Sequence, residues 1–361
     1  MYAGRPRGTF RRIFRATFSA TPMPKRRTRS TNSTGRSWFS RAALVIAAAL
    51  GLASCSGGDR RGSTGDSAAG AENRLVVFNA GSLALPLRAA LDSFAAREGV
   101  TIDQENAGSL ETARKLTELG KIPDLVGVAD YEVIPLLLIP DHASWYAKFA
   151  RNRMVLAYTD RSRGAAEIDG NNWWQVVTRP GVQVGRADPS LDPNGYRTLL
   201  VWQLAERHYK QPGLASRLLT TAPARNVRPK EADLVGLLEA GEFDYIWSYE
   251  SIANGIGLRY VVLPEAIDLS APADSAAYAV ASVQVAGKTP RDSITMRGQP
   301  IVYAFTIPTR APHPALAVKF AAYLASDDGR RVLRGAQLDV LEPYVIVGTG
   351  APAELTGGAV R

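Results

Sequence analysis

Two segments of this sequence share one design: an apolar stretch, the residues Ala-Gly-Ser, and then a pattern typical of a helix. The first is "VVFNAGSLALPLRAALDSF", in which large apolar residues recur at helical spacing after residue 82. The second is "ENAGSLETARKL", whose turn begins 27 residues after the first. The first amide groups of a helix lack intrahelical partners, so such a turn suits an anion. Two entrances of one design predict a single ligand between them.

The region that contains both turns alternates between the strand and helix patterns. The strand-like segments are "RLVVFNAG", "VTIDQENAG" and "DLVGVAD", and the helical segments between them cover residues 83–98 and 110–120. This order predicts an α/β fold with a doubly wound, mostly parallel sheet. Ligands of such sheets bind at the carboxyl ends of the strands, where both turns lie.

A second α/β unit follows the first. Its strands are "RMVLAYTD" (153–160), "VQVGRADP" and "FDYIWSY", and its helices cover residues 195–210 and 231–240. The run "PIVYAFTIP" (300–308) predicts a strand that returns to the first unit, before two helices (313–326 and 327–336) and a tail rich in Gly and Ala. Two lobes joined by two crossings therefore form a hinge.

The assignment of residues to the two lobes follows from these crossings. Residues 74–157 and 262–361 are assigned to lobe I, and residues 158–261 to lobe II. If the ligand bridges the lobes, binding shifts an open state toward a closed one.

Positive charge is concentrated at the start of the chain. The first 54 residues hold eleven Lys and Arg and no Asp or Glu, whereas the whole chain of 361 residues has a net charge of +9. The remainder therefore carries about −2, without the clustered basic surface that nucleic-acid binding requires. We expect no nucleic-acid partner.

The basic segment precedes an apolar run, "SRAALVIAAALGLAS", too short to span a membrane comfortably and typical of a secretory signal. The run ends at Leu52-Ala53-Ser54-Cys55, which resembles the bacterial lipobox, with Cys55 as the lipidated first mature residue; a small buried cysteine is the alternative. Cys55 is the only cysteine, which excludes a disulfide framework. We assign residues 1–54 to a signal peptide with a basic extension and 55–73 to a flexible tether.

Several side chains could bind an anion, and each has a structural alternative. Ser82 and Ser109 offer hydroxyl groups beside free amides, although Ser is also an ordinary helix cap. Asp192 in "DPNGYR" precedes a helix that it could simply cap. Glu231 stands where Pro229 opens a helix, a common place for a carboxylate, and Tyr249 could be a core aromatic.

Five motifs in this order resemble one family. "VVFNAGSL", "AGSLETARKLTELG", "DPNGYR", "VRPKEADLVGLLEAGEFDY" and "LPEAIDLS" are similar to the periplasmic molybdate/tungstate-binding proteins of ABC transporters, in the archaeal-type (WtpA-like) branch. The resemblance covers most of residues 74–340. It implies a type II periplasmic binding fold of two α/β lobes that close on a tetrahedral oxyanion, without a cofactor.

The resemblance also implies a set of ligand-binding positions. These are Gly81, Ser82, Ser109, Asp192, Pro193, Asn194, Glu231 and Tyr249. In this branch the carboxylates that match Asp192 and Glu231 bond the Mo or W centre itself, which offsets their repulsion of the dianion. Sulfate and phosphate lack a comparably expandable centre, so the same pair disfavours them.

The implied protein is a monomeric, lipid-anchored capture protein, secreted to the periplasm or cell surface, which delivers the oxyanion to an ABC permease and its ATPase. Alternatives keep the fold and bind sulfate, phosphate or an organic acid, or pass the ligand to a signalling partner. A serine hydrolase is disfavoured because no G-x-S-x-G elbow is present and His142, His208 and His313 lie outside the motifs. No histidine pair has metal-ligand spacing.

Overall fold

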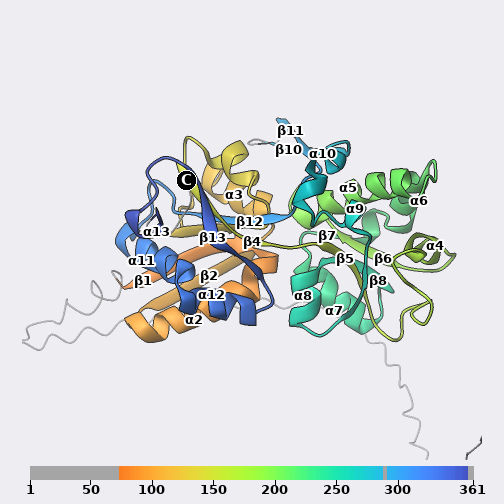
Figure 1. The fold of residues 1–361 in the computed structure, drawn as a ribbon, viewed down its shortest axis with the longest axis horizontal. Coiled ribbons are helices and arrows are strands. Elements are labelled where there is room, and N and C mark those ends of the chain that lie inside the picture. Colours follow the sequence, from red (N-terminus) through yellow and green to blue (C-terminus); the bar gives the residue numbers. More distant parts are fainter. Residues whose placement is uncertain (1–72, 288–290, 357–361) are drawn as a thin grey trace, which may run out of the picture. The chain divides into compact units, whose positions relative to one another are not determined.

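A computed structural model describes residues 73–287 and 291–356 (Figure 1). The predicted signal segment 1–54, the predicted lipidation site Cys55 and the tether up to residue 72 lie outside the described residues. Two main sheets, of six and five strands, define two lobes, and a separate hairpin accompanies them. Within the part of the chain that the structure describes, no helix has the length and apolar character needed to cross a membrane.

The first lobe is built on the six-stranded sheet, whose order is β13-β4-β12-β3-β1-β2. Its amino-terminal elements are β1 (Arg74–Ala80), a 3₁₀ turn (Gly81–Leu83), α2 (Ala84–Glu98), β2 (Thr101–Ala107), α3 (Ser109–Thr117), β3 (Leu125–Val128), a π-helical turn (Ile134–Leu138) and β4 (Trp145–Arg151). Strand β1 pairs in parallel with β2 and β3, and its register sets Ala80 opposite Ala107. Both predicted Ala-Gly-Ser turns therefore leave neighbouring strands at the same edge of the sheet.

The carboxyl-terminal part of the chain completes the first lobe. Its elements are β12 (Val302–Thr306), α11 (Pro314–Ala325), α12 (Asp327–Gly335), β13 (Asp339–Gly348) and α13 (Ala353–Thr356). Helix α2 lies beside α11 and α12 (Figure 1). Its buried side, which includes Leu87, Leu91 and Phe94, realises the predicted helical spacing. Phe94 meets Phe320 of α11 edge-on at 5.2 Å between ring centroids.

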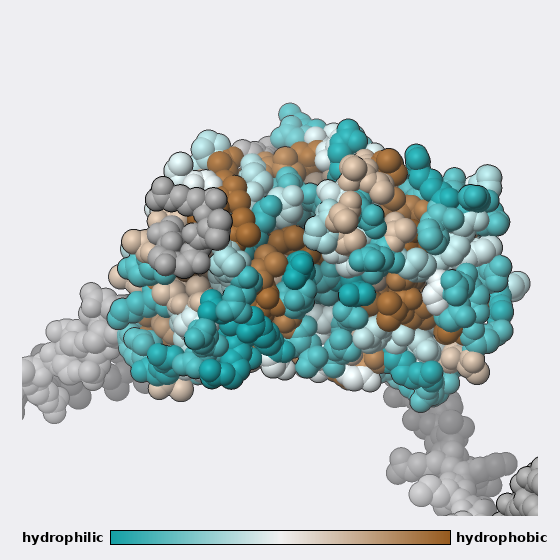
Figure 2. All heavy atoms as spheres, viewed as in Figure 1, coloured by the Kyte–Doolittle hydropathy of each residue, from teal (hydrophilic) through white to brown (hydrophobic). Residues whose placement is uncertain are grey.

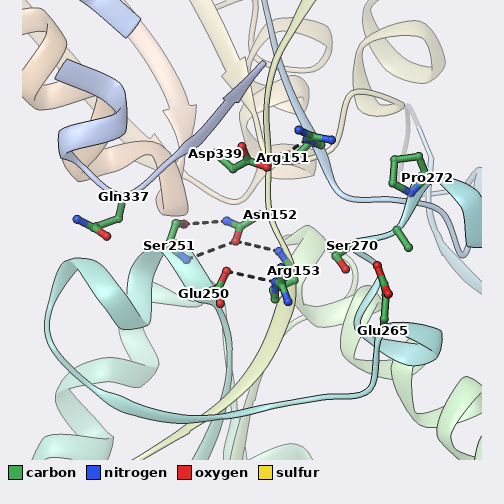
Figure 3. Close-up of a pocket in the computed structure, with 11 residues that line it drawn as sticks. Arg151, Asn152, Arg153, Glu250, Ser251, Glu265, Ser270, Pro272, Gln337 and Asp339 are labelled. Atoms are coloured by element: carbon green, nitrogen blue, oxygen red, sulfur yellow. Dashed lines mark hydrogen bonds and ion pairs between the residues drawn. The ribbon is translucent and has the colours of Figure 1, made fainter. Parts of the chain in front are cut away.

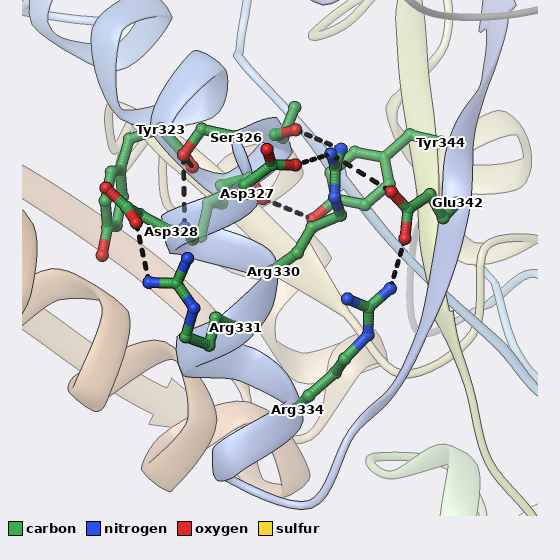
Figure 4. A network of polar contacts seen from close by, with 12 residues as sticks. Tyr323, Ser326, Asp327, Asp328, Arg330, Arg331, Arg334, Glu342 and Tyr344 are labelled. Carbon is green, nitrogen blue, oxygen red and sulfur yellow. Dashed lines mark hydrogen bonds and ion pairs between the residues drawn. The ribbon is translucent and has the colours of Figure 1, made fainter.

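A polar network attaches β13 to α12 (Figure 4). Ser326 caps α12 by accepting a hydrogen bond from the Gly329 amide at 3.2 Å. Arg330 and Arg334 then reach Glu342 of β13 at 3.3 and 2.5 Å. These ion pairs are partly exposed, so each contributes modestly to stability. They attach to α12 a strand that the sequence pattern did not reveal.

The second lobe is built on the five-stranded sheet, whose order is β7-β6-β8-β5-β9. Its elements are β5 (Met154–Tyr158), α4 (Trp173–Val177), β6 (Val184–Ala187), α5 (Pro193–His208), α6 (Leu214–Thr221), a 3₁₀ turn (Ala224–Asn226), β7 (Val227–Arg228), α7 (Ala232–Ala240), β8 (Tyr245–Tyr249), α8 (Glu250–Gly255) and β9 (Arg259–Val262). Buried indole rings fill its core: Trp247 of β8 packs edge-on against Trp173 of α4 and Trp202 of α5. This core fixes β8 and α5 relative to each other.

The segment between the lobes' sheets packs on the second lobe before the chain returns. It contains α9 (Glu265–Asp268), a 3₁₀ turn (Pro272–Asp274), α10 (Ser275–Tyr278) and the antiparallel hairpin β10 (Ser282–Ala286) and β11 (Ser293–Arg297). Both α9 and β10 contact α5. On the hairpin, the Ser282 carbonyl accepts a hydrogen bond from Gln203 at 2.9 Å.

The α/β fold with two lobes and two crossings is confirmed, with differences in detail. Each sheet is mixed: β1, β2 and β3 are parallel, as are β6, β7 and β8, but the crossing strands β4, β5 and β12 pair antiparallel. The chain changes sheets before β5, so the expected boundary at residues 157 and 158 falls at the end of a strand of the second sheet. The first strand after each crossing, β5 and then β12, runs opposite to the parallel strands of the sheet that it enters, which makes each sheet mixed.

The exposed large apolar side chains of the described residues are scattered over several elements. On the side shown in Figure 2, hydrophobic residues reach the surface in several separate patches among polar ones. Among the described residues, the most exposed large apolar side chains are Leu119 and Leu85, at 64% and 61%, and they lie on different elements. Scattered exposed apolar residues are normal for a folded domain and indicate no docking surface.

Candidate functional site

The two Ala-Gly-Ser turns of the first lobe face two helix entrances of the second. At the first turn, a Cβ placed on Gly81 would lie 3.9 Å from the Ala232 Cβ, at the start of α7. At the second turn, a Cβ on Gly108 would lie 2.0 Å from the Leu191 carbonyl oxygen and 3.0 Å from the Asp192 Cα, just before α5. The backbones of the two lobes therefore approach closely at Gly108, where only a glycine leaves enough room.

Asp192 joins the two helix entrances of the second lobe. Its Oδ1 accepts a hydrogen bond from the Asn194 amide at 2.9 Å and caps α5, as the sequence predicts. Its Oδ2 accepts a second bond, from the Glu231 amide at 3.0 Å, at the start of α7. The carboxylate is only 4% exposed, and burial raises its pKa to about 6 although both amides favour the charged form. One side chain thus ties Asn194 and Glu231 together.

Glu231 is the second buried carboxyl group of the site. Its Oε1 accepts hydrogen bonds from the Ser248 hydroxyl at 2.6 Å and the Tyr249 amide at 2.7 Å, both at the end of β8. Its Oε2 is buried and has no hydrogen-bond partner among the described residues. Burial, and then the negative charge of Asp192, raises the pKa of Glu231 to about 8. Burial and the neighbouring charge of Asp192 thus favour the protonated form of Glu231 in the ligand-free protein.

The two serines do not cap their helices, contrary to the structural alternative. No side-chain cap bond is present at the turn after β1, at α2 or at α3. Ser109 is fully buried, and its Oγ accepts a hydrogen bond from the Ala129 amide at 2.9 Å. The Ser82 Oγ is also buried and makes no hydrogen bond of ordinary geometry, although it lies beside the Tyr303 hydroxyl. Burial raises the pKa of Tyr303, and the nearby Ser82 hydroxyl lowers it.

Tyr249 and Asn194 complete the set of predicted residues. Tyr249 is fully buried, as expected of a core aromatic residue. Its hydroxyl nevertheless accepts a hydrogen bond from Arg197 Nη1 at 2.8 Å. The Asn194 Nδ2 donates to the Trp247 carbonyl at 3.3 Å, and its Oδ1 is buried without a partner. Pro193 occupies the first turn of α5, where its fixed φ suits a helix start.

Several buried polar atoms of this region have no hydrogen-bond partner among the described residues. They are Ser82 Oγ, Asn194 Oδ1 and Glu231 Oε2. A buried polar atom without a partner costs about 1–3 kcal/mol, so several in one region require an explanation. A polar ligand with several oxygens would satisfy donors and acceptors together.

Sequence reasoning missed two charged members of the site, Arg197 and Asp130. Arg197 lies one helical turn after Pro193 and Asn194 in the same motif, so its spacing places it on the same face of α5. Asp130 follows β3 and is only 1% exposed. It comes at the carboxyl end of a strand beside β1, where ligands of such sheets bind. Both positions therefore carried a usable signal.

Two cavities border the site. One, of about 290 Å³, is lined by Gly81 and Ser82 of the first lobe and by Ala232 and Val235 of the second. A larger one, of about 450 Å³, lies where the chain crosses between lobes (Figure 3). There Asn152 donates to Ser251 Oγ and to the Tyr303 hydroxyl, both at 2.7 Å. The larger cavity marks the hinge, and the smaller one opens beside the turns.

Groups suited to hydrolysis or to a resident metal do not gather at these serines. The hydrogen bonds of Ser82 and Ser109 within the described residues involve no histidine, and His313 pairs instead with Asp124 at 3.1 Å. Residues 73–287 and 291–356 contain no cluster of three or more His, Cys, Asp or Glu that could hold a metal ion. The site offers two carboxyl groups, hydroxyl groups and helix amides, a donor set for an oxyanion.

Known proteins resemble this chain in sequence and in fold. A family model described as bacterial extracellular solute-binding protein matches residues 75–336. An uncharacterized solute-binding protein of Petrotoga mobilis is 44% identical over 283 residues, covering 78% of this chain and 88% of the relative. The molybdate/tungstate-binding protein WtpA of Pyrococcus abyssi is 35% identical over 311 residues, covering 79% and 89%.

Among solved structures, the sulfate-binding protein SubI of Mycobacterium tuberculosis H37Rv superposes with a TM-score of 0.52 at 14% identity, covering 75% of this chain and 88% of that one. At this identity the likeness concerns the fold alone. It agrees with two α/β lobes joined by two crossings.

Proposed function

Because this chain belongs to the family of bacterial extracellular solute-binding proteins, we propose that its solute is molybdate or tungstate, held between the two lobes. The similarity to WtpA of Pyrococcus abyssi supports this choice of ligand. The observation that carries the proposal is the buried pair Asp192 and Glu231, at which Glu231 Oε2 has no partner within the described part of the chain. An unpartnered, buried carboxyl oxygen can offer its lone pair to a bound metal centre.

The pair suits a dianion only if its oxygens bond the central atom. Two ionised carboxylates near a dianion would repel it strongly in a site shielded from water. A hexavalent Mo or W centre can accept further hard oxygen donors, which replaces repulsion by bonding. The Ser82 and Ser109 hydroxyls and the amides at the start of α3 then donate to the ion's own oxygens. Sulfur and phosphorus centres lack this option, so sulfate and phosphate bind weakly.

The proposal is tested by calorimetric titration with sodium tungstate, sodium molybdate and sodium sulfate. We expect the first two ions to bind and sulfate to fail as a competitor. Asp192→Ala and Glu231→Gln should each weaken tungstate binding by about 100-fold or more, as loss of a buried charged partner does. Glu239→Gln is the matched control, because Glu239 is an exposed carboxylate near the end of α7. Tight sulfate, phosphate or organic-acid binding that survives both site substitutions would replace the proposal.

We further propose that Cys55 carries a lipid anchor and that the protein delivers its ligand to an ABC permease with its ATPase. The signal-like segment and the sequence Leu52-Ala53-Ser54-Cys55 support the anchor. Cys55→Ser should shift the protein from the membrane fraction to the soluble fraction without changing tungstate affinity. Retention of the variant in the membrane fraction would contradict anchoring through this residue.

A further inference from the structure

Arg197 connects the two lobes at the centre of the site, and it is not among the ligand-binding positions that the family resemblance implies. We propose that Arg197, with Asp130 and Tyr196, forms a latch across the cleft that orients two ligand-donating hydroxyl groups and slows release of the oxyanion. The proposal rests on the proposed function for the identity of the ligand. In this role Arg197 is a positioning residue, because it acts through Tyr249 and through the backbone of Ala129.

On the second lobe, Arg197 fixes the direction of the Tyr249 hydroxyl. Its Nη1 lies 2.8 Å from the Tyr249 oxygen. A guanidinium can only donate, so the tyrosine oxygen accepts this bond and its own proton must point elsewhere. Tyr249 is fully buried, next to the Glu231 carboxyl that its amide contacts. Arg197 therefore turns Tyr249 into a donor available to an anion.

On the first lobe, the same guanidinium holds the backbone of the residue that binds Ser109. The Ala129 carbonyl accepts a bond from Arg197 Nη1 at 2.7 Å, and the amide of the same residue donates to Ser109 Oγ at 2.9 Å. The Ser109 oxygen is thus an acceptor in this contact, which leaves its proton to donate elsewhere. Arg197 therefore fixes the position of Ala129, and through it the direction of the Ser109 hydroxyl.

Asp130 completes the latch by binding two residues of α5. Its Oδ2 accepts a hydrogen bond from the Tyr196 hydroxyl at 2.6 Å and lies 3.2 Å from Arg197 Nη2. Asp130, Tyr196 and Arg197 are each about 1% exposed. Burial disfavours the Arg197 cation, but Tyr249 and Asp130 hold its pKa above the ordinary value. A buried arginine requires such a partner, and Asp130 belongs to the other lobe.

Separation of the lobes would break these contacts together. Opening would separate Arg197 from Ala129 and Asp130, and it would separate Tyr196 from the Asp130 carboxylate. Arg197 also lowers the pKa values of Asp192 and Glu231, so its cation faces both carboxyl groups from inside the second lobe. We infer that the ligand and the latch stabilise the same closed state, and that loss of the latch appears mainly as faster dissociation.

The test compares two tyrosine variants that each lose one buried hydroxyl. Tyr196→Phe removes the bond to Asp130 across the cleft, whereas Tyr245→Phe removes a bond of equal length, 2.6 Å, to Arg163 within the second lobe. A hydrogen bond to a charged group corresponds to about tenfold or more in an equilibrium constant. We expect Tyr196→Phe to speed tungstate dissociation about tenfold in stopped-flow displacement, with little change in association. The Tyr245→Phe control should dissociate like the wild type.

Arg197→Lys and Asp130→Asn extend the test. Lysine keeps the positive charge but lacks the forked donor geometry of arginine, so Arg197→Lys should retain less than a tenth of the wild-type affinity for tungstate. Dissociation from Tyr196→Phe and Asp130→Asn at the wild-type rate would overturn the latch. If the wild-type protein binds neither tungstate nor molybdate, the proposed function fails. Small-angle scattering of the ligand-free proteins then tests whether the latch holds the lobes together. A larger radius of gyration for Asp130→Asn supports the latch, and an unchanged one overturns it.

Discussion

The second of the two Ala-Gly-Ser turns allows a sharp test of lobe closure through a single methyl group. Gly108 has φ −67° and ψ 151°, which alanine adopts without strain. The only obstacle is steric: an ideal Cβ would lie 2.0 Å from the Leu191 carbonyl oxygen and 2.6 Å from its carbon. Both atoms belong to the second lobe. Gly108→Ala should therefore leave each lobe folded and prevent full closure.

The size of the effect follows from the contacts that this methyl group would displace. Ordinary contact requires a separation larger by at least about 1 Å, since nonbonded carbon contacts lie near 3.5–4.0 Å. Close by, the Glu111 amide donates to the Leu191 carbonyl at 3.3 Å and Arg114 donates to the Ser190 carbonyl at 2.8 Å. Loss of two such bonds, one from a charged donor, costs about 2–4 kcal/mol. Tungstate affinity should fall by about 30- to 1,000-fold.

An exposed glycine of the second lobe supplies the matched control. A Cβ on Gly236 of α7 would meet no other atom within 4 Å, so Gly236→Ala should bind tungstate within about threefold of the wild type. Calorimetric titration measures the affinities, and small-angle scattering with saturating tungstate measures closure. Full affinity and full compaction of Gly108→Ala would refute the reasoning that these lobes close on Leu191.

Three further predictions concern protons and the hinge. Because the folded-state pKa values of Glu231 and Asp192 are raised to about 8 and about 6, above the values near 4 expected in the unfolded chain, the folded state retains protons that the unfolded chain releases. The ligand-free protein should therefore lose stability as pH rises from about 5 to about 8, by about 1.4 kcal/mol per pKa unit, and Glu231→Gln should flatten this trend in thermal unfolding. Tungstate binding should release up to about one proton near pH 7, seen as a dependence of calorimetric enthalpy on buffer ionisation; identical enthalpies in phosphate and Tris would contradict it. Asn152→Ala removes hydrogen bonds to Ser251 and Tyr303 at the crossing, so it should lower the melting temperature and increase amide exchange there. An unchanged melting temperature and unchanged amide exchange would contradict this role of Asn152 at the hinge.

Much of the fold followed from local patterns, and the failures have a physical cause. The predicted helix 83–98 corresponds to a 3₁₀ turn and α2, and the predicted helix 231–240 to α7, because apolar residues at helical spacing are read locally. Strand β13 was missed because its buried residues do not alternate regularly and Pro343 interrupts it. Its place is set by pairing with β4 and by ion pairs with α12, which no local pattern contains.

Site residues could be predicted where they stand at the start of a helix or at the end of a strand. Asp192 was expected before a helix and caps α5, and both turns were expected at strand ends and lie there. The roles proposed for these residues in ligand binding stay predictions. Spacing along α5 could have placed Arg197 on the same helix face as Asn194. Its partner could not be anticipated, because Asp130 lies in the other lobe, 67 positions earlier in the chain, and no local pattern contains such a long-range contact.

X-ray absorption at the tungsten L3 edge of the loaded protein tests the central claim most directly, since it counts the oxygen atoms bonded to the metal. The account predicts about six oxygen neighbours, the ion's own four and further ones from Asp192 and Glu231, and a loss of the added neighbours in Glu231→Gln. A four-oxygen shell in the wild-type protein, unchanged in the variant, would contradict it.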